Sequence, residues 1–191
     1  MINRQVIIGA CALVFSQLAS AASFDFTGLG TVPTNGYSAT DDGITVTVTA
    51  PGEDLWNYNL DGLGVSTGFF NLGGLQNGET LLVSFSEEVT LGSLDMRQWE
   101  GPDDVLFNSA GGNLNFNSDS CAFCTTETFD LTSITGITSF TLTGNSFLTV
   151  TFLSALNDVQ VTAVPVPAAA WLFISALGGL TGVRRLQKNK A

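Results

Sequence analysis

Ile44-Thr45-Val46-Thr47-Val48-Thr49 is the stretch that decides the fold class. Its apolar residues alternate with threonines, so an extended chain would have one apolar face and one polar face. A period of two residues is typical of a half-buried β-strand, and β-branched residues favour that conformation. The stretch therefore predicts a strand that lies against a hydrophobic core.

Similar patterns recur on both sides of this strand. Leu81–Ser86 also alternates, and Val89–Leu94 follows Glu87-Glu88 as its predicted hairpin partner. Glycine, asparagine and aspartate gather between the patterns, as they do in turns, and long helical periodicity is absent from residues 22–163. The further predicted strands are Phe24–Leu29, Val65–Phe70, Val105–Asn108, Asn113–Phe116, Phe129–Leu131, Ser139–Thr143, Phe147–Leu153 and Asp158–Val164.

These strands predict an all-β fold for the body of the chain. Short strands at regular spacing, without helices between them, are typical of a two-sheet β-sandwich, here of a jelly-roll-like kind. A chain of 191 residues fits one such domain. A body of this length is sufficient to bury a core between two sheets.

The N-terminus has the layout of a secretory signal peptide. Arg4 precedes an apolar run from Val6 to Phe15, and an A-x-A box ends at Ala21. We expect cleavage after Ala21, with an uncleaved anchor as the alternative. Cys11 lies inside the apolar run rather than after it, which disfavours a lipoprotein.

The C-terminus carries a second apolar segment. Ala168–Val183 has no charged residue, and Arg184, Arg185, Lys188 and Lys190 follow it. The run is short against the roughly 20 residues of a full span, but Val166 and Pro167 extend it. A basic flank stays in the cytoplasm, so we expect a single transmembrane helix with its N-terminal side outside and its C-terminal side inside.

The proline pair, apolar run and basic end together resemble the PEP-CTERM sorting signal of Gram-negative bacteria. The resemblance covers residues 164–190 and is closest to the variant that opens V-P-x-P-A-A-x-W-L-F, with Val166 in place of the glutamate that names the family. It implies recognition in the inner membrane by an exosortase, a membrane-embedded protease-transpeptidase, and release outward in bacteria that often make exopolysaccharide. An ordinary C-terminal anchor is the alternative. The motif residues are Val164, Pro165, Val166, Pro167, Ala168, Ala169, Trp171, Arg184 and Arg185.

The two ends divide the chain into three expected segments. Residues 1–21 are the signal peptide, residues 22–163 the exported β-sandwich and residues 164–191 the sorting signal. We therefore expect export across the inner membrane, a transient single-pass anchor there, and a final place at the cell surface or outside the cell.

The charge of the body excludes several functions. All 17 acidic residues but only one of the six basic residues, Arg97, lie within residues 22–163, which gives this segment a formal charge of −16. Nucleic-acid binding needs the opposite charge. The chain has no histidine, so neither a Ser-His-Asp nor a Cys-His arrangement can form. We expect no enzymatic activity; a glycan hydrolase with two carboxylates is the less favoured alternative.

Cys121-Ala122-Phe123-Cys124 has one of the spacings that cysteine chemistry uses. Export exposes the pair to an oxidising compartment, which favours a local disulfide between Cys121 and Cys124. Free thiols, or a redox or metal function, are the alternatives. A structural zinc site would need two further ligands.

Paired aspartates in turns could bind calcium, which is the one cofactor that the sequence suggests. Calcium takes six to eight oxygen ligands, and such groups are abundant in the body, although no D-x-D-x-D-G loop is present. Solvated turn residues are the default interpretation. The weak calcium candidates are Asp41, Asp42, Asp103 and Asp104.

Trp56, Tyr58 and Trp99 are large aromatic residues with a polar group, and such residues can stack on sugar rings when they are exposed. Burial in the core is the alternative. The sequence favours a non-enzymatic cell-surface or extracellular-matrix protein linked to exopolysaccharide or biofilm. The alternative is a lectin-like carbohydrate-binding β-sandwich module.

Overall fold

The computed structural model describes residues 21–58, 60–66, 73–99, 103–117, 125–146 and 150–162. Within these ranges the chain forms strands and turns but no helix, so the predicted all-β class is confirmed. The strands all belong to one compact unit, which ends at Val161. They are β1 (Ala22–Asp25), β2 (Tyr37–Asp41), β3 (Ile44–Thr49), β4 (Asp54–Tyr58), β5 (Gly62–Ser66), β6 (Thr80–Thr90), β7 (Ser93–Arg97), β8 (Asp104–Ser109), β9 (Gly112–Asn117), β10 (Thr126–Asp130), β11 (Ile137–Gly144) and β12 (Phe152–Val161).

The hydrogen bonds join these twelve strands into one antiparallel sheet. Its longest path has the order β10-β7-β12-β6-β11-β8-β9. β3 pairs with β6 and β2 with β3, while β1 and β5 pair with β12 and β4 with β5. The pairing therefore gives one large antiparallel sheet.

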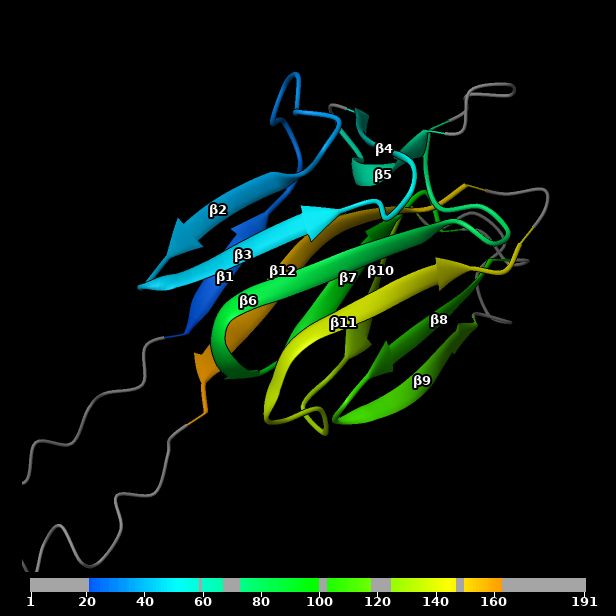
Figure 1. Ribbon diagram of the computed structural model, residues 1–191. Coiled ribbons are helices and arrows are strands. Elements are labelled where there is room, and N and C mark those ends of the chain that lie inside the picture. Colours follow the sequence, from blue (N-terminus) through cyan, green and yellow to red (C-terminus); the bar gives the residue numbers. More distant parts are fainter. Residues whose placement is uncertain are drawn as a thin grey trace, which may run out of the picture. The chain divides into compact units, whose positions relative to one another are not determined.

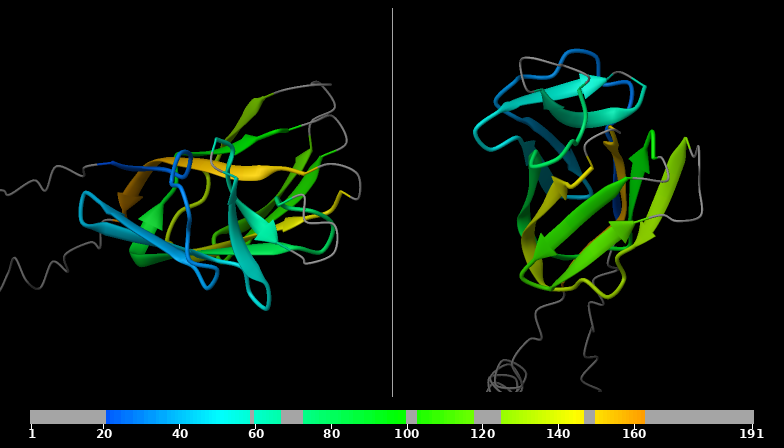
Figure 2. Two further views of the ribbon diagram at one scale, coloured as in Figure 1. Left: turned by 90° about the horizontal axis from the view of Figure 1, so that it is seen from above. Right: turned by 90° about the vertical axis from the view of Figure 1, so that its right-hand side faces the viewer.

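The sheet folds over so that two layers face each other (Figures 1 and 2). β3, β6 and β11 lie in one layer, and β1, β12, β7 and β10 lie in the other. The sheet passes from one layer to the other at the bend of β6, close to its end. Most of β6 pairs with β3 and β11, but Val89 and Thr90 pair with Val161 and Gln160 of β12. The core lies between the layers.

The predicted hairpin between Leu81–Ser86 and Val89–Leu94 is wrong. β6 continues through Glu87-Glu88 to Thr90, and β7 then pairs with β12 and β10 rather than with β6. The two glutamates are exposed at the bend, so solvent reaches them without a reversal of the chain.

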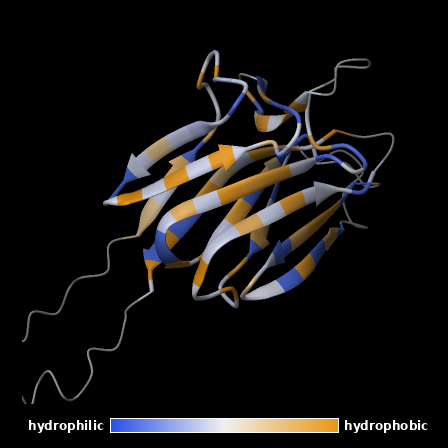
Figure 3. Cartoon of the chain, in the orientation of Figure 1, coloured by the Kyte–Doolittle hydropathy of each residue, from blue (hydrophilic) through white to orange (hydrophobic). Residues whose placement is uncertain are grey.

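Alternating side chains fill the space between the layers. In β3, Ile44, Val46 and Val48 are fully buried while the threonines between them are not, and apolar and polar bands alternate along several strands (Figure 3). Burial of each such side chain stabilises the fold by about 1.5–3 kcal/mol. The first predicted strand is thus confirmed with the same bounds.

A continuous row of aromatic rings crosses the core. Neighbouring rings in the row lie between 4.2 and 6.1 Å apart, centroid to centroid, a distance typical of favourable aromatic pairs. The row links β6, β11, β8, β9 and β10 to the residues after β7. Its members, in order, are Phe85, Phe140, Phe107, Phe116, Phe129 and Trp99.

Candidate functional site

Two of the three predicted sugar-contact residues are exposed on β4. Trp56 and Tyr58 are 41% and 52% exposed, and because they are two positions apart on a strand they share one face. Their partners across the β4–β5 pair are Gly64 and Gly62. A glycine has no side chain, so β5 covers neither ring.

The two glycines are required by a close approach of the backbone. A Cβ at Gly62 would meet the backbone of Leu153, and a Cβ at Gly64 would meet the backbone of Gly74. β12 and the segment at Gly74 therefore run close alongside β5, where Leu153 pairs with Leu63 and Gly74 with Val65.

The same close approach supports both rings from one side. The ring of Trp56 lies beside Gly73, and the ring of Tyr58 stacks on Phe152 with centroids 5.6 Å apart and planes inclined by 29°. Each ring is thus fixed by a neighbour on one side while much of its surface stays exposed.

Arg97 connects this aromatic pair to the adjacent sheet. It pairs with Phe152 across β7 and β12, and directly opposite residues lie on the same face of a sheet. Its Nη1 donates to the backbone oxygen of Leu60 at 2.6 Å, and Gln98 Nε2 donates to Asp61 Oδ2 at 2.6 Å. The single basic residue of the body therefore holds the β4–β5 turn against β7.

A hollow of about 160 Å³ lies next to Arg97 on the face of β1, β12 and β7 that points away from the core. Asp25 of β1 and Asp95 of β7 are both opposite Ala155 of β12. Their Cα atoms are therefore two strand spacings apart, about 10 Å, with only a methyl group between them. The lining residues are Asp25, Thr27, Asp95, Arg97, Thr126, Ser154 and Ala155.

Hydrogen bonds fix the orientation of both carboxylates. Asp25 Oδ1 accepts from the backbone N and Oγ1 of Thr27, at 2.8 and 2.7 Å. Asp95 Oδ1 accepts from Thr128 Oγ1 at 2.7 Å, and its Oδ2 accepts from Asn157 Nδ2 at 3.1 Å. A carboxylate oxygen accepts two hydrogen bonds, so both groups keep acceptor capacity for a ligand that carries hydroxyls.

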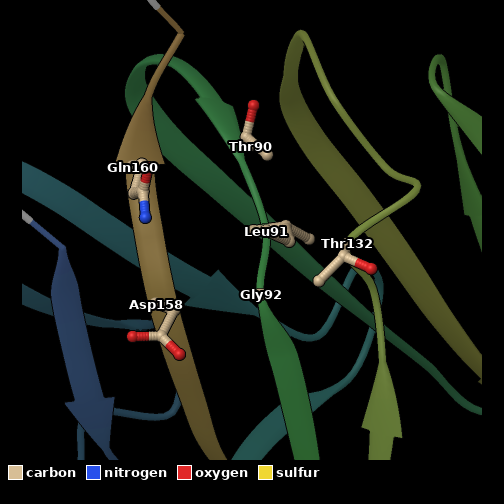
Figure 4. A pocket seen from close by; sticks show the side chains of 6 residues that line it. All are labelled: Thr90, Leu91, Gly92, Thr132, Asp158 and Gln160. Carbon is tan, nitrogen blue, oxygen red and sulfur yellow. The ribbon is translucent and has the colours of Figure 1, made fainter. Parts of the chain in front are cut away.

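A second hollow, of about 400 Å³, lies near the end of β12 (Figure 4). Asp158 and Gln160 come from β12, Thr132 from the turn after β10, and the others from the end of β6 and the residues after it. Thr132 donates from its backbone N and Oγ1 to Asp130 Oδ1, at 2.8 and 2.7 Å, which lowers the pKa of Asp130. The lining contains no aromatic ring, and its members are Thr90, Leu91, Gly92, Thr132, Asp158 and Gln160.

The prediction that Trp99 contacts a sugar is wrong, and its alternative, burial in the core, is the one observed. It is fully buried, its ring meets Phe129 edge-on at 4.9 Å, and its Nε1 has no acceptor among the described residues. Trp99 therefore belongs to the core and cannot contact a carbohydrate.

The two aspartate pairs considered for calcium lie at opposite ends of one layer. Asp41 and Asp42 are at the β2–β3 turn beside the bend of β6, whereas Asp103 and Asp104 are at the start of β8, beside the other end of β6. The length of β6 between them, about seven residues, spans roughly 23 Å. Among the described residues no group of three or more Asp, Glu or Cys could hold a metal ion.

Several predictions concern residues outside the described ranges. These are the signal peptide of residues 1–21, of which the structure describes only Ala21, the disulfide between Cys121 and Cys124, and the sorting signal from Val164 onward with its transmembrane helix. Within the described part of the chain, no helix is long and apolar enough to cross a membrane. The three predictions therefore stay predictions.

A scan against models of known protein families finds no match, and a search of curated proteins finds no relative.

Proposed function

We propose that the chain is an exported, non-enzymatic cell-surface or extracellular-matrix protein that an exosortase processes at its C-terminal sorting signal. The observation that carries the proposal is the V-P-V-P motif at 164–167, followed by an uncharged run and Arg184-Arg185. The partners are the exosortase and, before processing, the inner membrane, with the N-terminal side of the span outside. A link to exopolysaccharide or biofilm follows from the resemblance.

The bounds of the first and last described strands support this proposal. β1 begins at Ala22, directly after the predicted cleavage position, and β12 ends at Val161, three residues before the motif. The described strands thus lie between the two segments proposed to be removed. As part of the proposal, the folded-over sheet is a two-sheet β-sandwich of jelly-roll-like type, for which the two facing layers are the support.

Mass spectrometry of the exported protein tests the processing. We expect a mature N-terminus near Ala22 and a C-terminus that lacks the run after Pro167. A Pro165→Ala, Pro167→Ala double variant should retain the tail and stay in the inner membrane, whereas Gln187→Ala, beyond the arginines, serves as the control. Intact Trp171–Lys190 on protein recovered outside the inner membrane contradicts the proposal.

A second candidate function, a lectin-like carbohydrate-binding module, is favoured by one specific observation. Trp56 and Tyr58 share a face of β4, are supported from one side, and are about half exposed. Aromatic rings held in this way have an apolar surface available to a sugar ring.

A further inference from the structure

We infer that the outer face of β1, β12 and β7, together with Tyr58, binds a neutral glycan chain. The binding residues are Tyr58, Arg97, Asp95 and Asp25, named here the outer-face strip. This inference rests on the carbohydrate-binding candidate function and gives it a location and a ligand class.

The strip is continuous because each member contacts or adjoins the next. Tyr58 stacks on Phe152, and Phe152 pairs with Arg97. Arg97 and Asp95 both line the hollow, two positions apart on β7 and hence about 7 Å apart along the strand. Asp25 lines the other side of the same hollow. An aromatic ring therefore stands beside a row of hydrogen-bonding groups.

The chemistry of the strip matches that of a sugar. A sugar ring presents C–H groups on its faces, which pack on an aromatic surface, and hydroxyls around its edge. Ionised carboxylates only accept hydrogen bonds, so Asp25 and Asp95 suit hydroxyl donors, while Arg97 is a donor for ring or hydroxyl oxygens. Hydrogen bonds from Thr27, Thr128 and Asn157 hold the two carboxylates in place before binding, which lowers the cost of ordering them.

The charge of the domain selects a neutral ligand. Residues 22–163 carry a formal charge of −16, and Arg97 is the single basic residue among them. Polysaccharides that carry carboxylate or sulfate groups would be repelled on approach. A cationic polymer would be attracted to the whole surface rather than to this strip.

The hollow is large enough to enclose part of a sugar residue but not a whole one. A volume of about 160 Å³ corresponds to about five water molecules at ~30 Å³ each. The hollow can admit part of one sugar residue, while the neighbouring residues of a chain lie along the open face and against Tyr58.

Affinity electrophoresis of the purified exported protein tests this inference. Native gels contain dextran, laminarin or hydroxyethylcellulose as neutral polysaccharides, alginate as an anionic one, or chitosan as a cationic one. We expect retardation by at least one neutral polysaccharide, with little change when salt is raised, and no retardation by alginate.

Point variants locate the binding surface. Tyr58→Ala and Asp95→Asn should each weaken binding roughly tenfold, through lost stacking and a weaker hydrogen bond respectively. Tyr58→Phe keeps the stack on Phe152 and should bind within about threefold of wild type. Asp158→Asn makes the same charge change at the second hollow and should bind like wild type. Thermal unfolding of each variant separates lost binding from lost folding.

Three outcomes overturn the inference: no retardation by any neutral polysaccharide, equal weakening by Asp95→Asn and Asp158→Asn, or binding to chitosan alone that salt abolishes. Mass spectrometry determines the mature C-terminus in a separate experiment, which tests the proposed processing. A correctly processed protein that binds no neutral polysaccharide removes the strip but leaves export and sorting intact. A protein that binds a neutral polysaccharide but retains its tail contradicts the proposed processing and leaves the outer-face strip intact.

Discussion

The ring of Phe116 stacks on the ring of Phe129, with centroids 4.2 Å apart and planes inclined by only 18°. Phe116 belongs to β9 and Phe129 to β10, the strands at the two ends of the longest hydrogen-bonded path. No backbone pairing joins these two described strands. The folded-over sheet is therefore closed by β6–β12 hydrogen bonds at one side and by aromatic side chains at the other.

Phe116→Ala should destabilise the protein by about 3–5 kcal/mol, because it removes a buried ring from the row and leaves a cavity where β9 meets β10. Urea unfolding measures the loss. Leu106→Ala, at a partly exposed position on the neighbouring β8, is the control and should cost less than about 1 kcal/mol. Similar losses for the two variants would show that the aromatic contact does not close the sheet.

Gly64→Ala should cost about 1–3 kcal/mol, the usual range for overpacking, because the new methyl group would meet the backbone at Gly74. Backbone cannot rotate aside as a long side chain can. Gly28→Asn is the control: position 28 has open space and a φ of 67°, a conformation that asparagine tolerates. Thermal unfolding compares the two, and an unchanged midpoint for Gly64→Ala would contradict the close approach.

Glu53→Gln should stabilise the protein at neutral pH by less than about 1 kcal/mol. Glu53 is an exposed residue whose carboxyl is only slightly desolvated; this desolvation, and then the negative charge of Glu79, raises the pKa of Glu53, so the folded state holds this proton more tightly than the unfolded state. The resulting stability is present at low pH and is lost as pH rises through the raised pKa. Glutamine resembles the protonated form, so the gain should vanish in acid.

Urea unfolding of wild type and Glu53→Gln at about pH 7 and about pH 3.5, on either side of the range in which glutamates titrate, checks this pH dependence. Glu87→Gln removes the same charge at the bend of β6, another exposed position, and gives the general effect of lower net charge. A Glu53→Gln protein less stable than Glu87→Gln at neutral pH would reverse the expected sign.

Calcium and magnesium should raise the melting temperature equally, and sodium chloride at the same ionic strength should match them. Screening relieves the self-repulsion of an acidic domain without a specific site. The two candidate aspartate pairs lie too far apart to share an ion. A thermal shift series in the three salts decides the question: a calcium effect that saturates and exceeds that of magnesium would indicate a site.

The sequence predicts a strand well where its two faces differ. β3 alternates between buried aliphatic residues and threonines, so its period gives both its type and its bounds. β2 and β4 were not predicted, because Tyr37–Asp41 has no fully buried residue and Asp54–Tyr58 has one. Their strand conformation depends on pairing with β3 and β5, which no local pattern encodes.

The outer-face strip was only partly visible in the sequence. Tyr58 stands out by residue type, but its exposure depends on Gly62 opposite it. Asp25 and Asp95 are brought together by the register of β1 and β7 on β12, which sequence spacing cannot show. One signal was available: Leu94-Asp95-Met96-Arg97 alternates, which places Asp95 and Arg97 on one polar face.

The pairing of Ala22 with Val159 places the start of β1 beside the end of β12. Ala22 and Val161, which begin the first described strand and end the last one, therefore lie at the same pole of the domain. β12 runs from there to Phe152 beneath Tyr58, ten residues or roughly 30 Å away. On the proposed function, a molecule tethered at that pole holds Tyr58 at its distal tip. The length of one strand would then set how far the sugar-binding end stands out from the surface that carries it.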